Sequence, residues 1–323
     1  MSDLDLQPQE YLCGPVLRPP AEELLLTARR VFLGKTTEVA RALPDQQIRM
    51  IGAWCFLDHY GPEDVSAGPG MQVWAHPHTG LQTVSWLLEG EVEHRDSLGS
   101  RAMVRPGELN LMTAGHGIVH SELSQPDKPP RLHGVQLWVA LPDERRDIPP
   151  LFETYAALPD LIRPGVRGKV LVGELDGVRS PTPSHTPLVG ADLELAPGAS
   201  LDLQVSDDHE HGVFVVAGQV VVESTPVAVD QLLYLGSERT SLSLRSAGGG
   251  RAIVLGGLPF SEEIVMWWNF VGRSHDEIVA FREAWAARED RFPPVVNRLE
   301  KVMEAPPMPT VQLKPRPRRR YAG

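Results

Sequence analysis

The sequence predicts an all-β protein made of two antiparallel β-barrels or sandwiches and a C-terminal helix. Short apolar segments recur along the chain and are separated by turns that contain Gly, Pro or Asp. No helical pattern alternates with these segments, which excludes a doubly wound parallel sheet. The same style of strand and turn occurs in both halves of the chain, so we expect an internal duplication.

Length and composition limit the classes of function. The 323 residues are enough for two domains, and 42% of them are hydrophobic. With 31 basic and 42 acidic residues the net charge is −11, so direct binding to nucleic acid is not expected. Residues 1–25 lack a signal-peptide pattern and no run of 18 apolar residues occurs, which predicts a cytoplasmic protein without membrane segments. Cys13 and Cys55 are too few for a disulfide framework; both are expected to be reduced, with Cys55 in the core.

The first barrel is assigned to residues 28–142. A short helix is expected over Ala21–Arg30, followed by strands at Thr37–Leu43 and Gln47–Leu57, the second of which ends in a loop at Leu57–Pro62. Five further strands are bounded by turn residues: Thr83–Glu89, Val92–Arg95, Leu109–Thr113, Ile118–Leu123 and His133–Leu141. The segment Pro142–Pro150 is interpreted as a linker.

The second barrel, together with the helix, is assigned to residues 150–290, and residues 291–323 form a tail. Seven strands are expected in this barrel: Lys169–Glu174, Asp192–Leu195, Leu201–Val205, Gly212–Val216, Gln219–Glu223, Gln231–Leu235 and Ala252–Leu258.

The C-terminal helix has a start signal and an apolar face. Ser274 and Glu277 fit a capping box, and three apolar residues follow at helical spacing: Ile278, Phe281 and Trp285. A helix is therefore predicted from Asp276 to Ala287. The basic, Pro-rich segment Lys314–Arg320 is expected to be disordered.

Four residues in two closely spaced pairs predict a metal site in the first barrel. His76 and His78 form one pair, and His120 and Glu122 form the other. On a strand, residues i and i+2 point to the same face. If the two strands are neighbours with those faces inward, three imidazoles and one carboxylate converge on one point. This ligand set suits a divalent transition metal and favours Fe(II), with Mn, Co, Ni, Cu and Zn as alternatives.

The segments around these residues resemble the pirin family of the cupin superfamily. They are His76–Val84, Glu89–Gly99, Arg105–Glu108 and Met112–Glu122, with a weaker likeness through Met266–Val271 and the following helix. The resemblance implies two cupin barrels of the jelly-roll type, with a metal, usually iron, in the N-terminal barrel only. It also implies four metal ligands, His76, His78, His120 and Glu122.

Two positions depart from a simple metal pattern. General cupins and many pirins have a ligating Glu where this chain has Gln82, which is interpreted either as a hydrogen-bonding residue beside the metal or as core packing. In the second barrel, His209 and His211 form another pair, but His211 precedes Gly218 by 7 residues, whereas His78 precedes Gly90 by 12. We therefore do not expect a second metal site.

The remaining histidines and two tryptophans give weaker signals. His116 lies between two glycines and is interpreted as a loop residue or as a residue at the mouth of the pocket. His94 is expected to face solvent, and His133 to pack structurally or to line the barrel. Trp86 and Trp138 are expected in the core, where either could form the wall of a pocket. No role is predicted for three others, His59, His185 and His275.

Two hypotheses on function follow. The resemblance implies quercetin 2,3-dioxygenase activity, in which O₂ opens the heterocycle of a flavonol and carbon monoxide leaves. The expected partners are then a small aromatic substrate and O₂, with Glu122 as the proton acceptor, because a carboxylate ligand can leave the metal. The alternative is a non-enzymatic metal- or redox-sensing regulator that binds a protein partner, and turnover distinguishes the two. A metal-dependent isomerase or a sugar-binding cupin is a third, weaker hypothesis.

Overall fold

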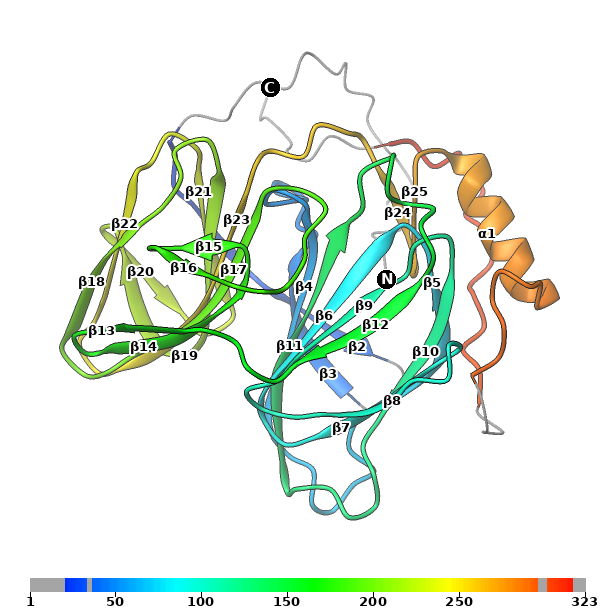
Figure 1. Ribbon diagram of the computed structural model, residues 1–323, viewed down its shortest axis with the longest axis horizontal. Coiled ribbons are helices and arrows are strands. Elements are labelled where there is room, and N and C mark those ends of the chain that lie inside the picture. Colours follow the sequence, from blue (N-terminus) through cyan, green and yellow to red (C-terminus); the bar gives the residue numbers. More distant parts are fainter. Residues whose placement is uncertain (1–20, 34–36, 296–300, 316–323) are drawn as a thin grey trace.

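The computed structural model describes residues 21–33, 37–295 and 301–315, and these form almost entirely β-structure. Figure 1 shows two barrels side by side, with the helix α1 (His275–Ala287) on the outer side of the first barrel. The predicted all-β fold with two barrels and a C-terminal helix is confirmed. No helix within the described ranges is long and apolar enough to cross a membrane.

Two sheets form the first barrel. The larger sheet contains β2 (Arg29–Leu33), β3 (Thr37–Leu43), β4 (Trp54–Asp64), β6 (Leu81–Glu89), β9 (Leu109–Thr113), β11 (Arg131–Ala140) and β12 (Leu151–Tyr155). The smaller sheet contains β5 (Gln72–His78), β7 (Val92–Asp96), β8 (Arg101–Val104) and β10 (Ile118–Leu123). Their spatial orders are β12-β9-β6-β11-β4-β3-β2 and β5-β10-β7-β8.

The second barrel is built in the same way. Its strands are β1 (Leu24–Thr27), β13 (Asp160–Arg163), β14 (Val166–Val172), β17 (Leu188–Leu195), β18 (Ala199–Gln204), β19 (Glu210–Val222), β20 (Thr225–Ala228), β21 (Gln231–Gly236), β22 (Ser241–Ser246) and β23 (Gly250–Gly257), beside a small hairpin of β15 (Glu174–Leu175) and β16 (Val178–Arg179). The order β21-β19-β23-β17 repeats β9-β6-β11-β4, and the pairing β18-β22-β19-β20 repeats β5-β10-β7-β8. The two barrels therefore share one topology, as an internal duplication requires.

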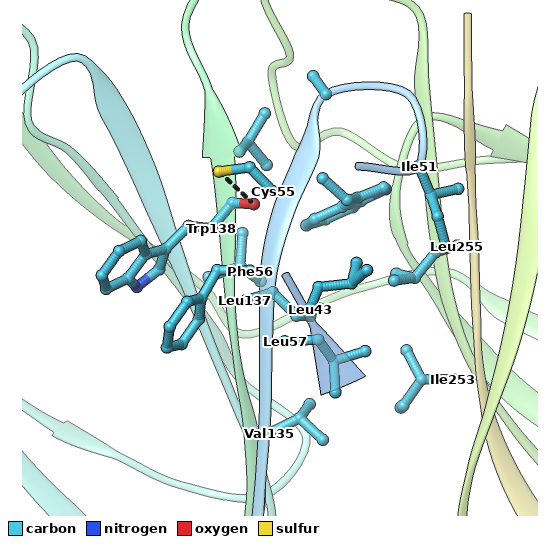
Figure 2. Packing of buried hydrophobic residues seen from close by; sticks show 14 of the residues in the cluster. Leu43, Ile51, Cys55, Phe56, Leu57, Val135, Leu137, Trp138, Ile253 and Leu255 are labelled. Atoms are coloured by element: carbon cyan, nitrogen blue, oxygen red, sulfur yellow. Dashed lines mark hydrogen bonds between the residues drawn. The ribbon is translucent and has the colours of Figure 1, made fainter. Parts of the chain in front are cut away.

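The strands β4 and β11 separate two environments. Because alternate residues of a strand point to opposite faces, Phe56 and Trp138 face the interior of the first barrel, while Leu57 and Leu137 face the second barrel (Figure 2). Both faces are buried over residues 54–60 of β4 and 132–140 of β11, which explains the apolar runs at residues 54–57 and 137–140.

A shared hydrophobic core joins the barrels. Figure 2 shows Leu57 and Val135 of the first barrel directed toward Ile253 and Leu255 of β23. All four side chains are fully buried, and each contributes about 1.5–3 kcal/mol of burial free energy. Cys55 also lies in this core, as predicted, and burial raises the pKa of its thiol to about 12.

The predicted helix over Ala21–Arg30 is wrong. The segment forms β1, which pairs with β21 of the second barrel, and β2, which pairs with β3 of the first. The leucines of β1 have good helix propensity, but cross-strand pairing with the exposed edge of β21 outweighs that weak preference. Likewise β12, within the range 150–290 assigned from the sequence to the second barrel, pairs with β9 of the first.

Three other expectations in the strands also require correction. The strand predicted over Gln47–Leu57 begins only at Trp54, because Gly52 turns the chain with φ +54 against the backbone of Gly257. The loop predicted at Leu57–Pro62 is instead part of β4. The two predicted strands within residues 212–223 are halves of the single strand β19, whose register shifts between Val215 and Ala217.

The C-terminal part of the chain returns to the first barrel. The hairpin of β24 (Val265–Trp267) and β25 (Phe270–Gly272) is joined to the first barrel through a bridge between Phe270 and Thr79, the residue after β5. The helix α1 follows with the predicted cap, in which the Ser274 side chain accepts a hydrogen bond from the backbone N–H of Glu277. Beyond the helix, Met303 donates its backbone N–H to the carbonyl of Ala75 in β5. Most of the basic segment 314–320 lies outside the described residues.

Candidate metal centre

Strands β5 and β10 bring three predicted ligands together. His76 lies directly opposite His120 in the antiparallel register, and Ile118 lies opposite His78. Each of the three imidazoles offers one nitrogen atom, and these three atoms lie within 4.8 Å of one another. All three side chains are buried. Among the described residues, this is the one group of three or more ligand-type side chains with such spacing.

The hydrogen bonds of His76 and His78 leave the same ring nitrogen of each free for a metal. His76 Nδ1 donates to the carbonyl of Trp74 at 2.8 Å, and His78 Nδ1 donates to the carbonyl of Asn269 at 3.0 Å. In a neutral imidazole the Nε2 atom then carries a lone pair. The two Nε2 atoms face each other at 3.1 Å. Two lone pairs this close repel unless a cation lies between them.

His120 is held differently. Its Nδ1 lies 3.4 Å from Nδ1 of His94, and Nε2 of His94 lies 3.2 Å from Oδ2 of Asp96. The Nε2 atom of His120 is buried and has no hydrogen-bond partner among the described residues. A buried nitrogen without a partner is costly, and a bound metal ion would supply the missing partner.

Electrostatics favour the neutral imidazoles that metal binding requires. Burial lowers the pKa of His76 to about 4 and holds the pKa values of His78 and His120 well below 6.5. The three rings are therefore uncharged near neutral pH and do not need to lose protons before they bind a cation. Fixed acceptors, neutral rings and a buried unpartnered nitrogen together fit a divalent metal.

The histidines are in the wall of a cavity of about 520 Å³, a volume that includes space open to solvent. Its wall contains apolar, aromatic, charged and amide side chains: Leu33, Arg41, Phe56, Asp58, Val73, His76, His78, His120, Glu122, Gln136, Trp138, Asn269 and Met303.

An aromatic wall extends from the histidines into the cavity. The rings of Phe56 and Trp138 stack with centroids 4.0 Å apart and an interplanar angle of 11°. Trp138 meets His78 edge-on at 4.9 Å, and the guanidinium of Arg41 lies 4.4 Å above the centroid of Phe56. Trp138 thus forms a wall of the pocket, one of the two roles considered for it.

A polar row crosses the inner face of the larger sheet beside this wall. Successive cross-strand neighbours in the row are Arg41, Asp58, Gln136, Ser85, Asn110 and Thr154. The Arg41 guanidinium donates to both carboxylate oxygens of Asp58 at 2.7 Å, so this buried pair is neutral overall. Gln136 lies at the centre of the row and lines the cavity.

Glu122 lies in the cavity wall but outside the group of three nitrogens. The register between β10 and β5 shifts between His120 and Glu122, so that Glu122 pairs with Val73. Ser85 Oγ donates to Oε1 of Glu122 at 3.1 Å. Burial raises the pKa of this carboxyl group, which makes it a stronger base than an exposed glutamate.

Several predicted residues have other roles in the structure. Gln82 donates to Thr113 Oγ1 at 2.9 Å and does not line the cavity. His116 contacts the carbonyl of Ile148 at 3.3 Å in a loop. The indole of Trp86 donates to Asp192 at 2.8 Å, between the barrels.

Two histidines need a fuller account. The expectation that His94 faces solvent is wrong, because its ring is buried and stacks on Phe152 at 4.1 Å. His133 packs structurally at the junction of the barrels, with Nε2 2.8 Å from Nε2 of His59. His59, for which the sequence gave no signal, also binds Asp230 there at 2.6 Å.

Sequence reasoning missed four contributors to the site. His94 and Asp96 form an i, i+2 pair on β7, the same signal that identified the ligands, but their partner His120 is on another strand. Asn269 and Met303 reach the cavity from the C-terminal segment, more than 190 residues after His78 in the chain, and no local pattern reports such contacts.

The pair in the second barrel does not form a comparable group. The rings of His209 and His211 have centroids 6.2 Å apart, and no third ligand joins them among the described residues. Between them, Glu210 accepts hydrogen bonds from the backbone N–H of Gly52 at 2.6 Å and from the Tyr234 hydroxyl at 2.7 Å. The motif thus ties the second barrel to the segment that precedes β4.

Known proteins resemble this chain along most of its length. Residues 36–139 match the family model described as Pirin, and residues 190–293 match the model described as Pirin C-terminal cupin domain. A Pseudomonas aeruginosa protein named "Putative quercetin 2,3-dioxygenase" is 45% identical over 298 residues, covering 90% of this chain and 93% of that protein. A pirin-like protein of Caulobacter vibrioides is 36% identical over 278 residues, or 84% and 95% of the two chains. The crystal structure of quercetin 2,3-dioxygenase from Acinetobacter baumannii superimposes with a TM-score of 0.87 at 39% identity, covering 90% and 96%.

Proposed function

The chain belongs to the pirin family of two-cupin proteins, and we propose that it is a metal-dependent dioxygenase that opens the heterocyclic ring of a flavonol with O₂. The observation that carries this proposal is the convergence of three neutral, buried imidazoles in the wall of a cavity that aromatic side chains also line. The names of the relatives and of the superimposed crystal structure give the reaction class.

The proposed metal ligands are His76, His78, His120 and Glu122. The donor set favours Fe(II), and Mn, Co, Ni, Cu or Zn are alternatives. A bound divalent metal would supply Lewis acidity that stabilises the deprotonated hydroxyl of the flavonol. Four protein ligands leave up to two positions of an octahedral site for other molecules.

The cavity wall supports the choice of a planar aromatic substrate. Phe56 and Trp138 contribute aromatic side chains to the cavity wall, and Trp138 lies beside His78. Gln136 has a carboxamide in the cavity wall, next to Ser85 in the polar row, and it can donate a hydrogen bond to a carbonyl oxygen of the substrate.

Glu122 is the proposed general base. Its carboxyl group lines the same cavity as the three histidines, and burial raises its pKa toward the operating pH. It would accept the proton of the flavonol hydroxyl, while the hydrogen bond from Ser85 Oγ holds the carboxylate in place. The products are then the ring-opened ester and carbon monoxide.

The test is O₂ uptake with quercetin after anaerobic loading with Fe(II), with metal content and carbon monoxide release measured on the same samples. Wild type is compared with His120→Ala and, as a matched control outside the cavity, His209→Ala. We expect uptake above the free-metal rate in wild type and in His209→Ala and none in His120→Ala. Bound metal without turnover in wild type would reject the dioxygenase and support the alternative, a metal-sensing regulator that binds a protein partner.

A further inference from the structure

The three histidines of the metal centre differ in what holds the second ring nitrogen. For His76 and His78 the acceptor is a backbone carbonyl, which can only accept. For His120 the neighbour is the imidazole of His94, which can donate or accept. The tautomer of His120 is therefore not fixed by this contact alone. Whatever fixes the protons of His94 also fixes those of His120.

Asp96 provides that constraint. Its Oδ1 accepts hydrogen bonds from the backbone N–H groups of Leu98 and Ser100, both at 2.9 Å, so the carboxylate is held in place by the turn after β7. Its Oδ2 faces Nε2 of His94 at 3.2 Å. A carboxylate accepts and does not donate, so a neutral His94 ring carries its single proton on Nε2.

The position of the proton on the His94 ring determines the position of the proton on the His120 ring. Neutral His94 with a proton on Nε2 has a lone pair on Nδ1. The Nδ1 atom of His120, 3.4 Å away, then donates to it. His120 is left with its lone pair on Nε2, which is the buried atom without a partner among the described residues.

The packing keeps these groups in register. On the paired strands β7 and β10, Asp96 lies opposite His120 and His94 lies opposite Glu122. The ring of His94 stacks on Phe152 of β12 with an interplanar angle of 10°. His94, Asp96 and His120 are all at most 3% exposed, so water does not compete for their hydrogen bonds.

We propose that His94 and Asp96 are positioning residues that fix His120 in the tautomer with a free Nε2 and thereby raise the affinity of the centre for its metal. This inference deepens the proposed function and rests on the same metal centre. Partners of this kind orient the ligating ring, and their removal typically weakens metal binding by about 10–100-fold.

Asp96→Asn tests the direction of the proton order. The amide would still accept from the turn through its oxygen, but its NH₂ group would now donate to Nε2 of His94. The proton of His94 would move to its Nδ1 atom. The Nδ1 atom of His120 would then accept that proton's hydrogen bond through its lone pair, and His120 would carry its own proton on Nε2. We expect metal affinity, measured with Co(II) or Ni(II) against a competing chelator, to fall about 10–100-fold.

Two variants of His94 and one control variant distinguish a change of tautomer from damage to the fold. His94→Asn keeps an acceptor oxygen near the former Nδ1 position and should bind metal more tightly than His94→Leu, which has none. Asp192→Asn changes an equally buried aspartate between the barrels, which accepts from Trp86 and Arg251. It should leave metal affinity unchanged.

The tautomer is also measured without metal, by long-range ¹H–¹⁵N NMR of the histidine rings. The proposal predicts a proton on Nδ1 of His120 in wild type and on Nε2 in Asp96→Asn. The same tautomer and the same metal affinity in both proteins would overturn it. If the wild type has the predicted tautomer but binds no metal, both the proposed function and the claim about metal affinity are wrong. If the wild type binds metal and Asp96→Asn binds it equally well, only this inference is wrong.

Discussion

The strand pair β5–β10 of the first barrel and the pair β18–β22 of the second occupy the same place in the topology. They differ in the chemistry of their buried side chains, which are histidines in the first pair and leucines in the second. In the first pair, His120 lies opposite His76. In the second pair, Leu244 lies opposite Leu201 and Leu242 lies opposite Leu203. All four leucines are buried in one hydrophobic cluster.

The comparison separates what the fold provides from what the side chains provide. The barrel places inward-facing residues of two paired strands close to each other in both halves of the chain. Histidines at these positions make a candidate metal centre, and leucines make a core. The cupin barrel is thus a scaffold, and the chemistry lies in a few residues on it.

The histidine pair and the leucine pairs also differ in how much they stabilise their barrels. Buried leucines gain about 1.5–3 kcal/mol each from removal from water. Buried imidazoles gain less and leave the His120 Nε2 atom without a partner. A metal-binding barrel therefore gives up stability that ligand binding restores.

The largest expected effect compares two buried glutamates. At matched metal occupancy, Glu122→Gln should lower kcat for quercetin by about 10²–10⁴-fold, because the amide cannot accept the substrate proton. Glu210→Gln should leave kcat unchanged and lower the free energy of unfolding, since the glutamate joins Gly52 and Tyr234 across the barrels. Steady-state kinetics and urea unfolding of both variants decide the matter. Equal kcat in Glu122→Gln and wild type would remove the glutamate from the mechanism.

The next effect contrasts the two strand pairs directly. Leu244→Ala should lower the free energy of unfolding by about 2–5 kcal/mol, because it opens a cavity in the core of the second barrel. In metal-free protein, His120→Leu should lower that free energy by less, since it removes the unpartnered Nε2 atom of His120 but also takes the donor away from Nδ1 of His94. Urea titrations with a chelator present measure both. A large loss of stability in His120→Leu would contradict this contrast.

A smaller effect concerns the junction of the barrels at acid pH. Burial, together with the neighbouring His59, lowers the pKa of His133 to about 4. Between pH 6.5 and 4 the unfolded chain binds a proton at this residue that the folded protein does not, so stability falls as the pH falls. The loss is up to about 3 kcal/mol. Unfolding free energies of wild type and His133→Gln across this range should diverge; parallel curves would refute the assignment.

The smallest effect concerns substrate binding. Gln136→Leu should raise KM for quercetin about 5–30-fold, equivalent to about 1–2 kcal/mol, because one hydrogen bond to the substrate is lost. Metal content should not change, since Gln136 is not one of the three clustered imidazoles or the carboxylate beside them. Steady-state kinetics at fixed metal occupancy measure the effect. An unchanged KM would indicate that the substrate does not reach the polar row.

Much of the metal centre could be predicted from the sequence because its information is local. The i, i+2 spacing of His76 and His78 fixes their common face, and β9 and β10 have the bounds that the sequence predicts. Gly90, between β6 and β7, and Gly107, between β8 and β9, mark turns with φ values of +87 and +85, which glycine adopts easily. Local signals of this kind predict the structure correctly, because the tertiary packing favours the same strands and turns.

The parts that could not be predicted depend on contacts between distant segments. The leucines of β1 are compatible with a helix, and only the free edge of β21 selects a strand. The acceptor for His78 is a backbone carbonyl of Asn269, and any residue type at that position would provide it. The burial of His94 depends on Phe152, which comes from a strand beyond the predicted linker.

The most direct test of the difference between the barrels is the metal stoichiometry. Metal-free protein is titrated anaerobically with Fe(II), and with Co(II) to obtain an absorption spectrum of the bound ion, in wild type, His76→Ala and His211→Ala. We predict one tightly bound ion per chain in wild type and in His211→Ala, and none in His76→Ala. Two ions per chain, or one ion that His211→Ala removes and His76→Ala retains, would contradict the assignment of the centre to the first barrel.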